Sequence, residues 1–214
     1  SSPRALMVTG DSSVRDIDFF ETIDNIRILN HTLATNIDAK NKHVEVEDLG
    51  TGRISVVPYD VLVIATGAVP SIPPIPGINQ KGIFTLRSLE DAEKIRQALS
   101  LGAARDVYII GGGIVGISAA EELQDAGARI TILEKKEYLM QGMLDRDMAL
   151  HAQAELSRKG IKILTNCQVN QVESVGTSLR IRTSSGSHDA DLIIISAGVA
   201  PNIELARNAG LKIG

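Results

Sequence analysis

The fold of this chain is decided by the stretch Val-Tyr-Ile-Ile-Gly-Gly-Gly-Ile-Val-Gly, residues 107–116, and by Glu134, which follows eighteen residues after its last glycine. Between them lie a run rich in small residues and a second apolar run, residues 129–133. This pattern predicts strand, glycine turn, helix and strand, with an acid at the end of the second strand. Such an order is typical of a dinucleotide-binding unit in an α/β sheet.

Each glycine of the pattern G-x-G-x-x-G has a physical role. Gly111 permits the tight turn off the strand, and Gly113 carries no side chain that would keep a pyrophosphate away from the backbone. Gly116 lets the helix pack closely on the sheet. The helix N-terminus offers unpaired N–H groups and the positive end of its dipole to phosphates. We therefore interpret the stretch as a nucleotide site rather than as a purely structural turn.

Glu134 determines which nucleotide is expected. Its carboxylate can accept hydrogen bonds from a ribose 2′-hydroxyl and would repel a 2′-phosphate, so the sequence predicts NAD(H) rather than NADP(H). Lys135 and Lys136 follow directly. They are interpreted as solvated surface charges, although they could also soften the discrimination against NADPH.

Composition narrows the class of protein. The chain has 214 residues, 43% of them hydrophobic and 22% charged, as in ordinary globular proteins with one large or two small domains. A net charge of −4, 3% aromatic residues and no Trp give no reason to expect a nucleic-acid partner. The apolar runs are shorter than the ~20 residues that a membrane helix needs, and no secretory signal is recognised. The single cysteine argues against a disulfide framework and favours a cytoplasmic location.

The sequence contains no candidate metal site and no candidate catalytic residue. The four histidines are scattered without metal-ligand spacing and are interpreted as surface or packing residues: His31, His43, His151 and His188.

An internal repeat relates the two halves of the chain. Residues 60–70 and 191–201 align without a gap, and Asp, Ile, Gly and Pro recur in register. Each copy predicts a central parallel strand that is buried on both faces and ends in a turn of small residues. Upstream of each strand, alternating patterns predict a small antiparallel meander. Cys167 aligns with Thr32 and is expected to be a structural cysteine in a meander strand rather than a nucleophile.

The repeat also predicts a missing part. Gly116 precedes Ile161 by 45 residues, and the equivalent glycine loop of the first copy would fall before Ser1. We therefore expect a truncated or excised piece of a longer protein. The alternative is a natural remnant whose first unit has lost its cofactor.

Two further helices are expected around the glycine motif. Residues 71–77 form a stiff, proline-rich connector. Ser88 caps a helix that reaches Leu99, with the apolar face Leu89, Ala92, Ile95 and Leu99. A second helix begins at Asp145 and ends at Gly160, with its inward residues Met148, Ala152 and Leu156.

Together with these motifs, the stretches at residues 13–20 and 84–92 resemble the FAD- and NAD-dependent pyridine nucleotide-disulfide oxidoreductases. The similarity is strongest to the coenzyme A-disulfide reductase and NADH oxidase branch. In that family an NAD domain is inserted into an FAD domain. The resemblance implies an α/β chain in which residues 1–79 are a partial FAD-binding domain and residues 80–202 a complete, doubly wound Rossmann-type NAD(H)-binding domain. Residues 203–214 would begin the return into the FAD domain.

The resemblance also implies positions that contact the cofactors. For NAD(H) these are Gly111, Gly113, Ile114, Val115, Gly116, Glu134, Lys135, Ala197 and Gly198. For FAD they are Ala34, Ala65, Thr66 and Gly67. In the full-length protein, expected to be a homodimer, hydride would pass from NADH to FAD and then to a disulfide, such as CoA disulfide, or to oxygen.

Three departures from the family leave the activity open. Ile114 stands where the family usually has an aromatic residue, and Ser118 stands where it often has Glu. The redox-active cysteine of the disulfide-reducing branch would lie before Ser1. Disulfide reductase, NADH oxidase and ferredoxin- or rubredoxin-type reductase therefore all remain open, as does a non-catalytic NAD(H)-binding or sensing module. The isolated chain is expected to bind NADH without turnover.

Overall fold

A computed structural model describes residues 17–22, 25–100 and 105–214, so residues 13–16 of the first resembling stretch lie outside it. The chain divides into two compact units, residues 1–67 with 201–214 and residues 68–200. The boundary falls earlier than the expected one after residue 79, because the connector packs on the second unit. The Ser71 N–H donates to the Gly198 carbonyl at 2.9 Å, and Ile78 is buried in a core cluster of that unit.

The second unit is built on a five-stranded parallel sheet. Its order is β5-β12-β6-β7-β8. The inner strands are buried on both faces, and Ile109, Ile132 and Ile194 are fully inaccessible to solvent. The strand at the outer edge, β5, was not anticipated. The strands are β5 (Ile83–Thr85), β6 (Asp106–Ile110), β7 (Arg129–Leu133), β8 (Lys162–Leu164) and β12 (Leu192–Ile195).

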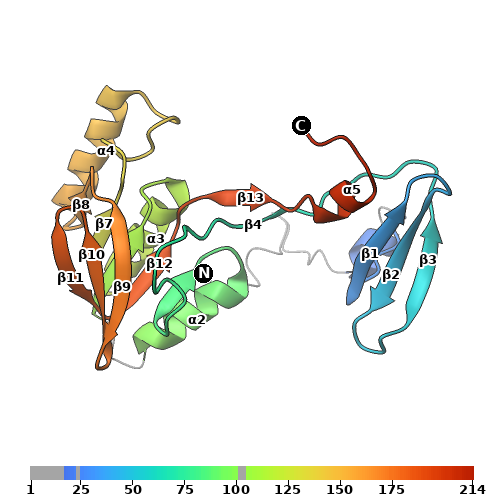
Figure 1. The fold of residues 1–214 in the computed structure, drawn as a ribbon, viewed down its shortest axis with the longest axis horizontal. Helices are drawn as coiled ribbons and strands as arrows, with labels where there is room; N and C mark the ends of the chain where they lie inside the picture. Colours follow the sequence, from blue (N-terminus) through green and yellow to red (C-terminus); the bar gives the residue numbers. More distant parts are fainter. Residues whose placement is uncertain (1–16, 23–24, 101–104) are drawn as a thin grey trace. The chain divides into compact units, whose positions relative to one another are not determined.

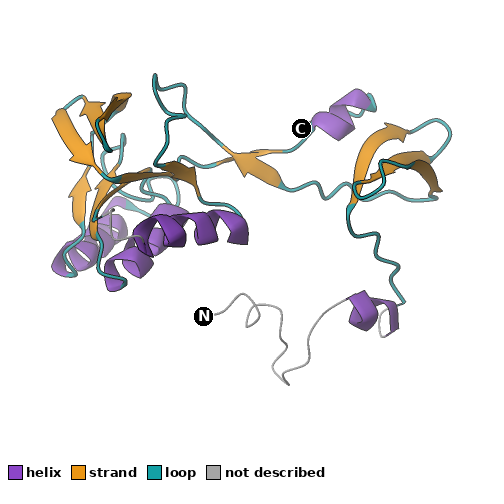
Figure 2. Ribbon diagram, turned by 90° about the horizontal axis from the view of Figure 1, so that it is seen from below, coloured by secondary structure: helices purple, strands orange, loops and turns teal. Residues whose placement is uncertain are grey.

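Helices cover one face of this sheet and a meander covers the other (Figure 1, Figure 2). One core cluster packs Ile95, Ala120 and Leu156 of the helices against the sheet, and the other packs Val172 and Ile181 of the meander against it. The elements are α2 (Leu89–Ser100), α3 (Ile114–Asp125), α4 (Arg146–Arg158), β9 (Val169–Val175), β10 (Ser178–Thr183) and β11 (Gly186–Ala190). The predicted Rossmann-type α/β fold is thereby confirmed.

The helix α2 begins as predicted but buries less than predicted. The Asp91 N–H donates to Ser88 Oγ at 3.2 Å and the Ser88 N–H donates to the Asp91 carboxylate at 3.0 Å, which together form a capping box. Ile95 is buried, whereas Leu89 and Ala92 are exposed. The helix packs on the sheet through its C-terminal half, so its first turn is left uncovered.

Of the three residues predicted to face inward on α4, Ala152 and Leu156 do so, whereas Met148 does not. Met148 is 60% exposed, whereas Ala149 is fully buried. The inward stripe is Ala149 and Leu156, which are buried, with Ala152 half-buried between them, and it follows the helical spacing of three and four residues. Met148 lies about 100° around the helix from Ala149 and therefore faces solvent.

The first unit also contains an antiparallel meander. Each copy of the repeat therefore has a meander, as predicted. Its strands are antiparallel in the order β1-β2-β3. The remaining short strands, β4 and β13, pair with each other. The elements of the first unit are α1 (Ile17–Thr22), β1 (Thr32–Asp38), β2 (His43–Asp48), β3 (Ile54–Pro58) and α5 (Glu204–Asn208). β4 (Ala68–Pro70) belongs to the second unit, and β13 (Val199–Pro201) ends at the boundary.

The expected buried strand before Gly67 is not formed. Val61 and Val63 are 84% and 81% exposed, and residues 61–67 belong to no sheet. A parallel strand needs neighbours for its backbone groups, and the described part of the first unit supplies none beside this segment. Cys167 is buried as expected but precedes β9 rather than lying in a strand. No helix within the described ranges is long and apolar enough to cross a membrane.

Candidate nucleotide-binding site

A groove of about 1020 Å³ lies at the carboxyl ends of the parallel strands in the second unit. Its floor is formed where β6 and β12 end side by side, and the loops that follow these strands, residues 111–113 and 196–198, both line it. From β6 the chain continues to β7 and β8 on one side of that strand, whereas β12 and β5 lie on its other side. Such a switch in strand order is the place where open α/β sheets bind ligands.

The three glycines of the motif serve different purposes in this geometry. Gly111 has a φ of +113°, and a Cβ at this position would collide with the Ser196 carbonyl. A Cβ at Gly116 would collide with the Gly111 carbonyl beneath the helix. A Cβ at Gly113 would meet nothing within 4 Å. Gly111 and Gly116 are therefore required by packing, whereas Gly113 leaves its side of the groove open at the N-terminus of α3.

Gly112 was not identified from the sequence, since the motif leaves its position free. A Cβ there would collide with Leu139, which is fully buried, and would lie 3.1 Å from the Glu134 carboxylate. The Gly112 N–H donates to Glu134 Oε2 at 2.6 Å. The middle glycine thus lets the turn pack against the segment that follows β7.

Glu134 is held at the end of β7 by backbone hydrogen bonds. Its Oε2 accepts from Gly112, and its Oε1 accepts from the Lys136 N–H at 2.8 Å. The residue is 8% exposed and lines the groove. Each carboxylate oxygen retains a further lone pair, so the fixed carboxylate can still accept hydrogen bonds from a ribose.

The two lysines after Glu134 differ in their surroundings. Lys136 Nζ donates to the Gln141 carbonyl at 3.0 Å, which ties it to its own loop. Lys135 is exposed at the groove and makes no hydrogen bond or ion pair with the described residues. Both lysines line the groove, and Lys135 is the one whose ammonium group is not tied to another described residue.

The structure brings the sequence-predicted NAD(H) positions together. Ile114 and Val115 begin α3 and are 55% and 50% exposed. Ala197 and Gly198 follow β12 on the opposite side of the switch point. Apart from Gly116, which lies under the helix, all of these positions line the groove: Gly111, Gly113, Ile114, Val115, Glu134, Lys135, Ala197 and Gly198.

Two further segments of the groove wall carry no sequence motif. One is the loop after β7, residues 140–143, and the other is residues 167–170, which lead into β9. Only the sheet order places them beside the glycine turn, so no local signal could have identified them. The Cys167 N–H donates to the Glu134 carbonyl at 2.9 Å, which joins the second segment to the end of β7.

The positions expected to contact FAD lie in the first unit. Ala34 is in β1 opposite Val46. Thr66 Oγ1 donates to the Asn202 carbonyl at 2.5 Å, and the Asn202 N–H donates to the Gly67 carbonyl at 2.9 Å. The turn Ala65-Thr66-Gly67, with Gly67 at a φ of +69°, is therefore fixed to the returning segment, while all four predicted positions are exposed.

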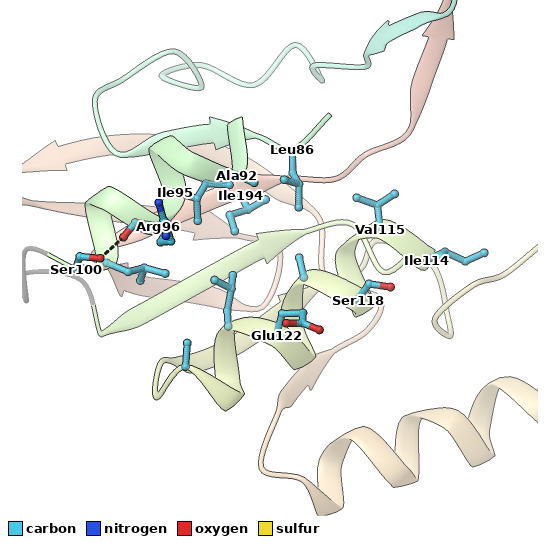
Figure 3. A pocket seen from close by; sticks show the side chains of 14 residues that line it. Leu86, Ala92, Ile95, Arg96, Ser100, Ile114, Val115, Ser118, Glu122 and Ile194 are labelled. Atoms are coloured by element: carbon cyan, nitrogen blue, oxygen red, sulfur yellow. Dashed lines mark hydrogen bonds between the residues drawn. The ribbon is translucent and has the colours of Figure 1, made fainter. Parts of the chain in front are cut away.

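A second groove, of about 590 Å³, runs between α2 and α3 (Figure 3). It is mainly apolar, with Ile95 and Ile194 among its lining residues, and Arg96 and Glu122 add the charges. It shares Leu86, Ile114 and Val115 with the nucleotide groove, so the two are adjacent along the first turn of α3.

Two residues of β6 have shifted pKa values. The hydrogen bonds from Arg129 lower the pKa of the Asp106 carboxyl, and burial raises the pKa of Tyr108. Neither residue lines the nucleotide groove. Among the described residues, no group of three or more His, Cys, Asp and Glu side chains is arranged to hold a metal ion.

Comparison with known proteins identifies the family of this site. The sequence pattern of the pyridine nucleotide-disulphide oxidoreductases matches residues 7–214, and the chain belongs to that family. An NADH oxidase of Methanocaldococcus jannaschii is 34% identical over 190 residues, which are 89% of this chain and 42% of the relative. The resemblance inferred from the sequence is thereby confirmed.

Solved structures agree with this assignment. An NAD-dependent persulfide reductase from A. fulgidus superposes with a TM-score of 0.91 at 38% identity, over 99% of this chain and 39% of that protein. A water-forming NADH oxidase from Lactobacillus brevis bound to NADH gives a TM-score of 0.75 at 27% identity, over 82% and 39% of the two chains. The chain thus spans about two fifths of the length of these relatives.

Proposed function

We propose that this chain is the NADH-binding part of an FAD-dependent oxidoreductase. The observation that carries the proposal is the groove in which Gly113 leaves the N-terminus of α3 open while Glu134 is fixed at the end of β7. In this proposal the backbone at Gly111, Gly113 and Gly116 receives the pyrophosphate and Glu134 accepts from the ribose. Ile114 and Val115, together with Lys135, Ala197 and Gly198, form the walls around the rest of the nucleotide.

The second cofactor belongs to the longer protein. We propose that the first unit is the FAD-binding portion, with Ala34, Ala65, Thr66 and Gly67 against the flavin nucleotide, and that the second unit binds NAD(H). FAD would accept hydride from NADH, while the protein supplies binding, orientation and electrostatics. The relatives named NADH oxidase and persulfide reductase support oxygen or a small-molecule disulfide, such as CoA disulfide, as the final acceptor.

The remaining expectations are part of the same proposal. The full-length protein is proposed to be a homodimer in the cytoplasm that has no nucleic-acid partner. The net charge of −4 supports the absence of a nucleic-acid partner and the single cysteine supports the cytoplasm, while the homodimer rests on the family resemblance.

The proposal is tested with the 214-residue chain by titrating NADH and following the fluorescence of the nucleotide. Saturable binding without NADH oxidation is expected, and the absence of binding would overturn the assignment of the groove. A second sample is incubated with excess FAD and desalted, after which its visible absorption is recorded. A colourless protein is expected; a retained flavin band would mean that the first unit alone holds the cofactor.

The rival function is a non-catalytic NAD(H)-binding or sensing module. It is favoured by the sequence, which holds one complete nucleotide site and no candidate catalytic acid, base or nucleophile. The two functions separate in the full-length gene product. Bound FAD and NADH-driven electron transfer support the enzyme, and NADH binding without either supports the module.

A further inference from the structure

One wall of the nucleotide groove is a loop, residues 135–145, that is fixed to the glycine turn. The Met140 N–H donates to the Gly112 carbonyl at 2.8 Å, and Leu139 packs against Gly112. Met140 has a φ of +54°, so this tight connection is made in a backbone conformation that side chains rarely adopt. A chemical change on this loop therefore acts next to the nucleotide.

Met143 in this loop is both part of the groove and open to solvent. It lines the groove and is 61% exposed. Its N–H donates to the Met140 carbonyl at 2.9 Å, which fixes its place in the turn. Met148, on α4, has nearly the same exposure at 60% but lines neither groove. Of the described methionines, Met143 and Met148 are equally exposed, and of these two only Met143 lines the groove; Met140 also lines it but is half-buried.

We propose that Met143 is an oxidation site through which a peroxide weakens nucleotide binding; this inference rests on the function proposed above. The thioether sulfur donates an electron pair to one oxygen of hydrogen peroxide, the O–O bond breaks, and the products are the sulfoxide and water. Sulfur is oxidised and the peroxide is reduced. Methionine sulfoxide reductases reverse this change, so the modification can act as a switch.

The sulfoxide alters the groove in two ways. A flexible, apolar and polarisable side chain becomes a polar one, so its dispersion contacts with a bound nucleotide weaken. Its oxygen also brings partial negative charge to a site that must accept phosphates. We expect the affinity for NADH to fall roughly threefold to tenfold, in line with the loss of a modest packing contact.

The experiment compares the 214-residue chain with Met143→Leu and Met148→Leu, each before and after treatment with hydrogen peroxide that is then removed by catalase. Leucine keeps the volume and cannot be oxidised. Peptide mass spectrometry records which methionines carry oxygen, and NADH titration gives the dissociation constant. Dithiothreitol, which does not reduce the sulfoxide, separates any effect of Cys167 from that of methionine, and methionine sulfoxide reductase tests reversal.

Oxidation is expected to weaken NADH binding in the parent chain and in Met148→Leu, to leave Met143→Leu unchanged, and to be reversed by the reductase only. An unchanged dissociation constant with Met143 shown to be oxidised would overturn the inference, as would an equal loss in Met143→Leu. If the untreated chain does not bind NADH, the proposed function fails, and this inference fails with it.

Discussion

Replacing Glu134 by alanine is expected to narrow the preference for NADH over NADPH. The substitution removes the acceptor for ribose hydroxyls and also the acceptor for the Gly112 and Lys136 N–H groups. Disorder in the glycine turn would weaken both nucleotides alike, because both place the same pyrophosphate there. The ratio of the two dissociation constants therefore isolates the ribose contact.

The size of the change follows from the fixed, buried carboxylate. A hydrogen bond to a charged group contributes about 1.5–3 kcal/mol, and about 1.4 kcal/mol corresponds to a factor of ten in affinity. NADH loses at least one such bond, whereas NADPH is relieved of repulsion between the carboxylate and its 2′-phosphate. We expect the ratio of dissociation constants, NADPH over NADH, to fall at least about tenfold.

The assay is a fluorescence titration of both nucleotides, with thermal unfolding to show that each variant is folded. Glu137→Ala is the matched control, because it removes the same charge three residues away. Glu137 pairs with Arg146 at 2.8 Å and does not line the groove, so its loss should leave the ratio unchanged. An unchanged ratio in Glu134→Ala would refute the assignment of this acid to the ribose.

Three further predictions follow from the same structure. Gly113→Ala should leave the unfolding temperature nearly unchanged yet weaken NADH binding at least about tenfold. Gly111→Ala should lower the unfolding temperature, because a Cβ at Gly111 has no room and the φ of Gly111 is positive. Equal unfolding temperatures of the two variants would contradict this division. Because hydrogen bonds from Arg129 lower the pKa of Asp106, the pair stabilises the fold above the ordinary carboxyl pKa of 3.8 and loses that effect as the pH falls through the folded-state value. Asp106→Asn should therefore be less stable at neutral pH, by under about 1 kcal/mol because the pair is exposed, and the difference should vanish in strong acid; thermal unfolding against pH measures it. Because Val61 and Val63 are 84% and 81% exposed in the first unit, the isolated chain is expected to self-associate; Val63→Asp should reduce the association measured by light scattering without changing NADH binding.

The sequence predicts most reliably those features that depend on residues close together in the chain. The continuous apolar run before Gly111 and the turn itself define β6 and the start of α3, and the observed elements agree. On α4, one of the three residues predicted to face inward, Met148, was wrong. Met148, Ala149 and Leu150 are consecutive apolar residues, so periodicity alone admits more than one inward face. Only packing selects Ala149, which is fully buried.

The groove wall shows a second limit of sequence reasoning. Met143 and Gln168 border the same groove although neither belongs to a motif. Their positions follow from the order of β6, β7 and β8 in the sheet. Gly112 was missed for a related reason, since the side chain that requires it to be glycine belongs to Leu139, beyond the following strand.

The two copies of the repeat carry the same apolar pattern, but only one of them forms a strand. Residues 192–195 form a fully buried strand because β5 and β6 pair with its two edges. Residues 61–64 carry the same pattern but have no paired neighbour in the described chain, and Val61 is 84% exposed. The turn that follows them is nevertheless formed, because the hydrogen bonds that join Thr66 and Gly67 to Asn202 come from within the first unit. A short apolar run therefore becomes a parallel strand only where neighbouring strands pair with it, whereas a turn closed by its own hydrogen bonds forms without such neighbours.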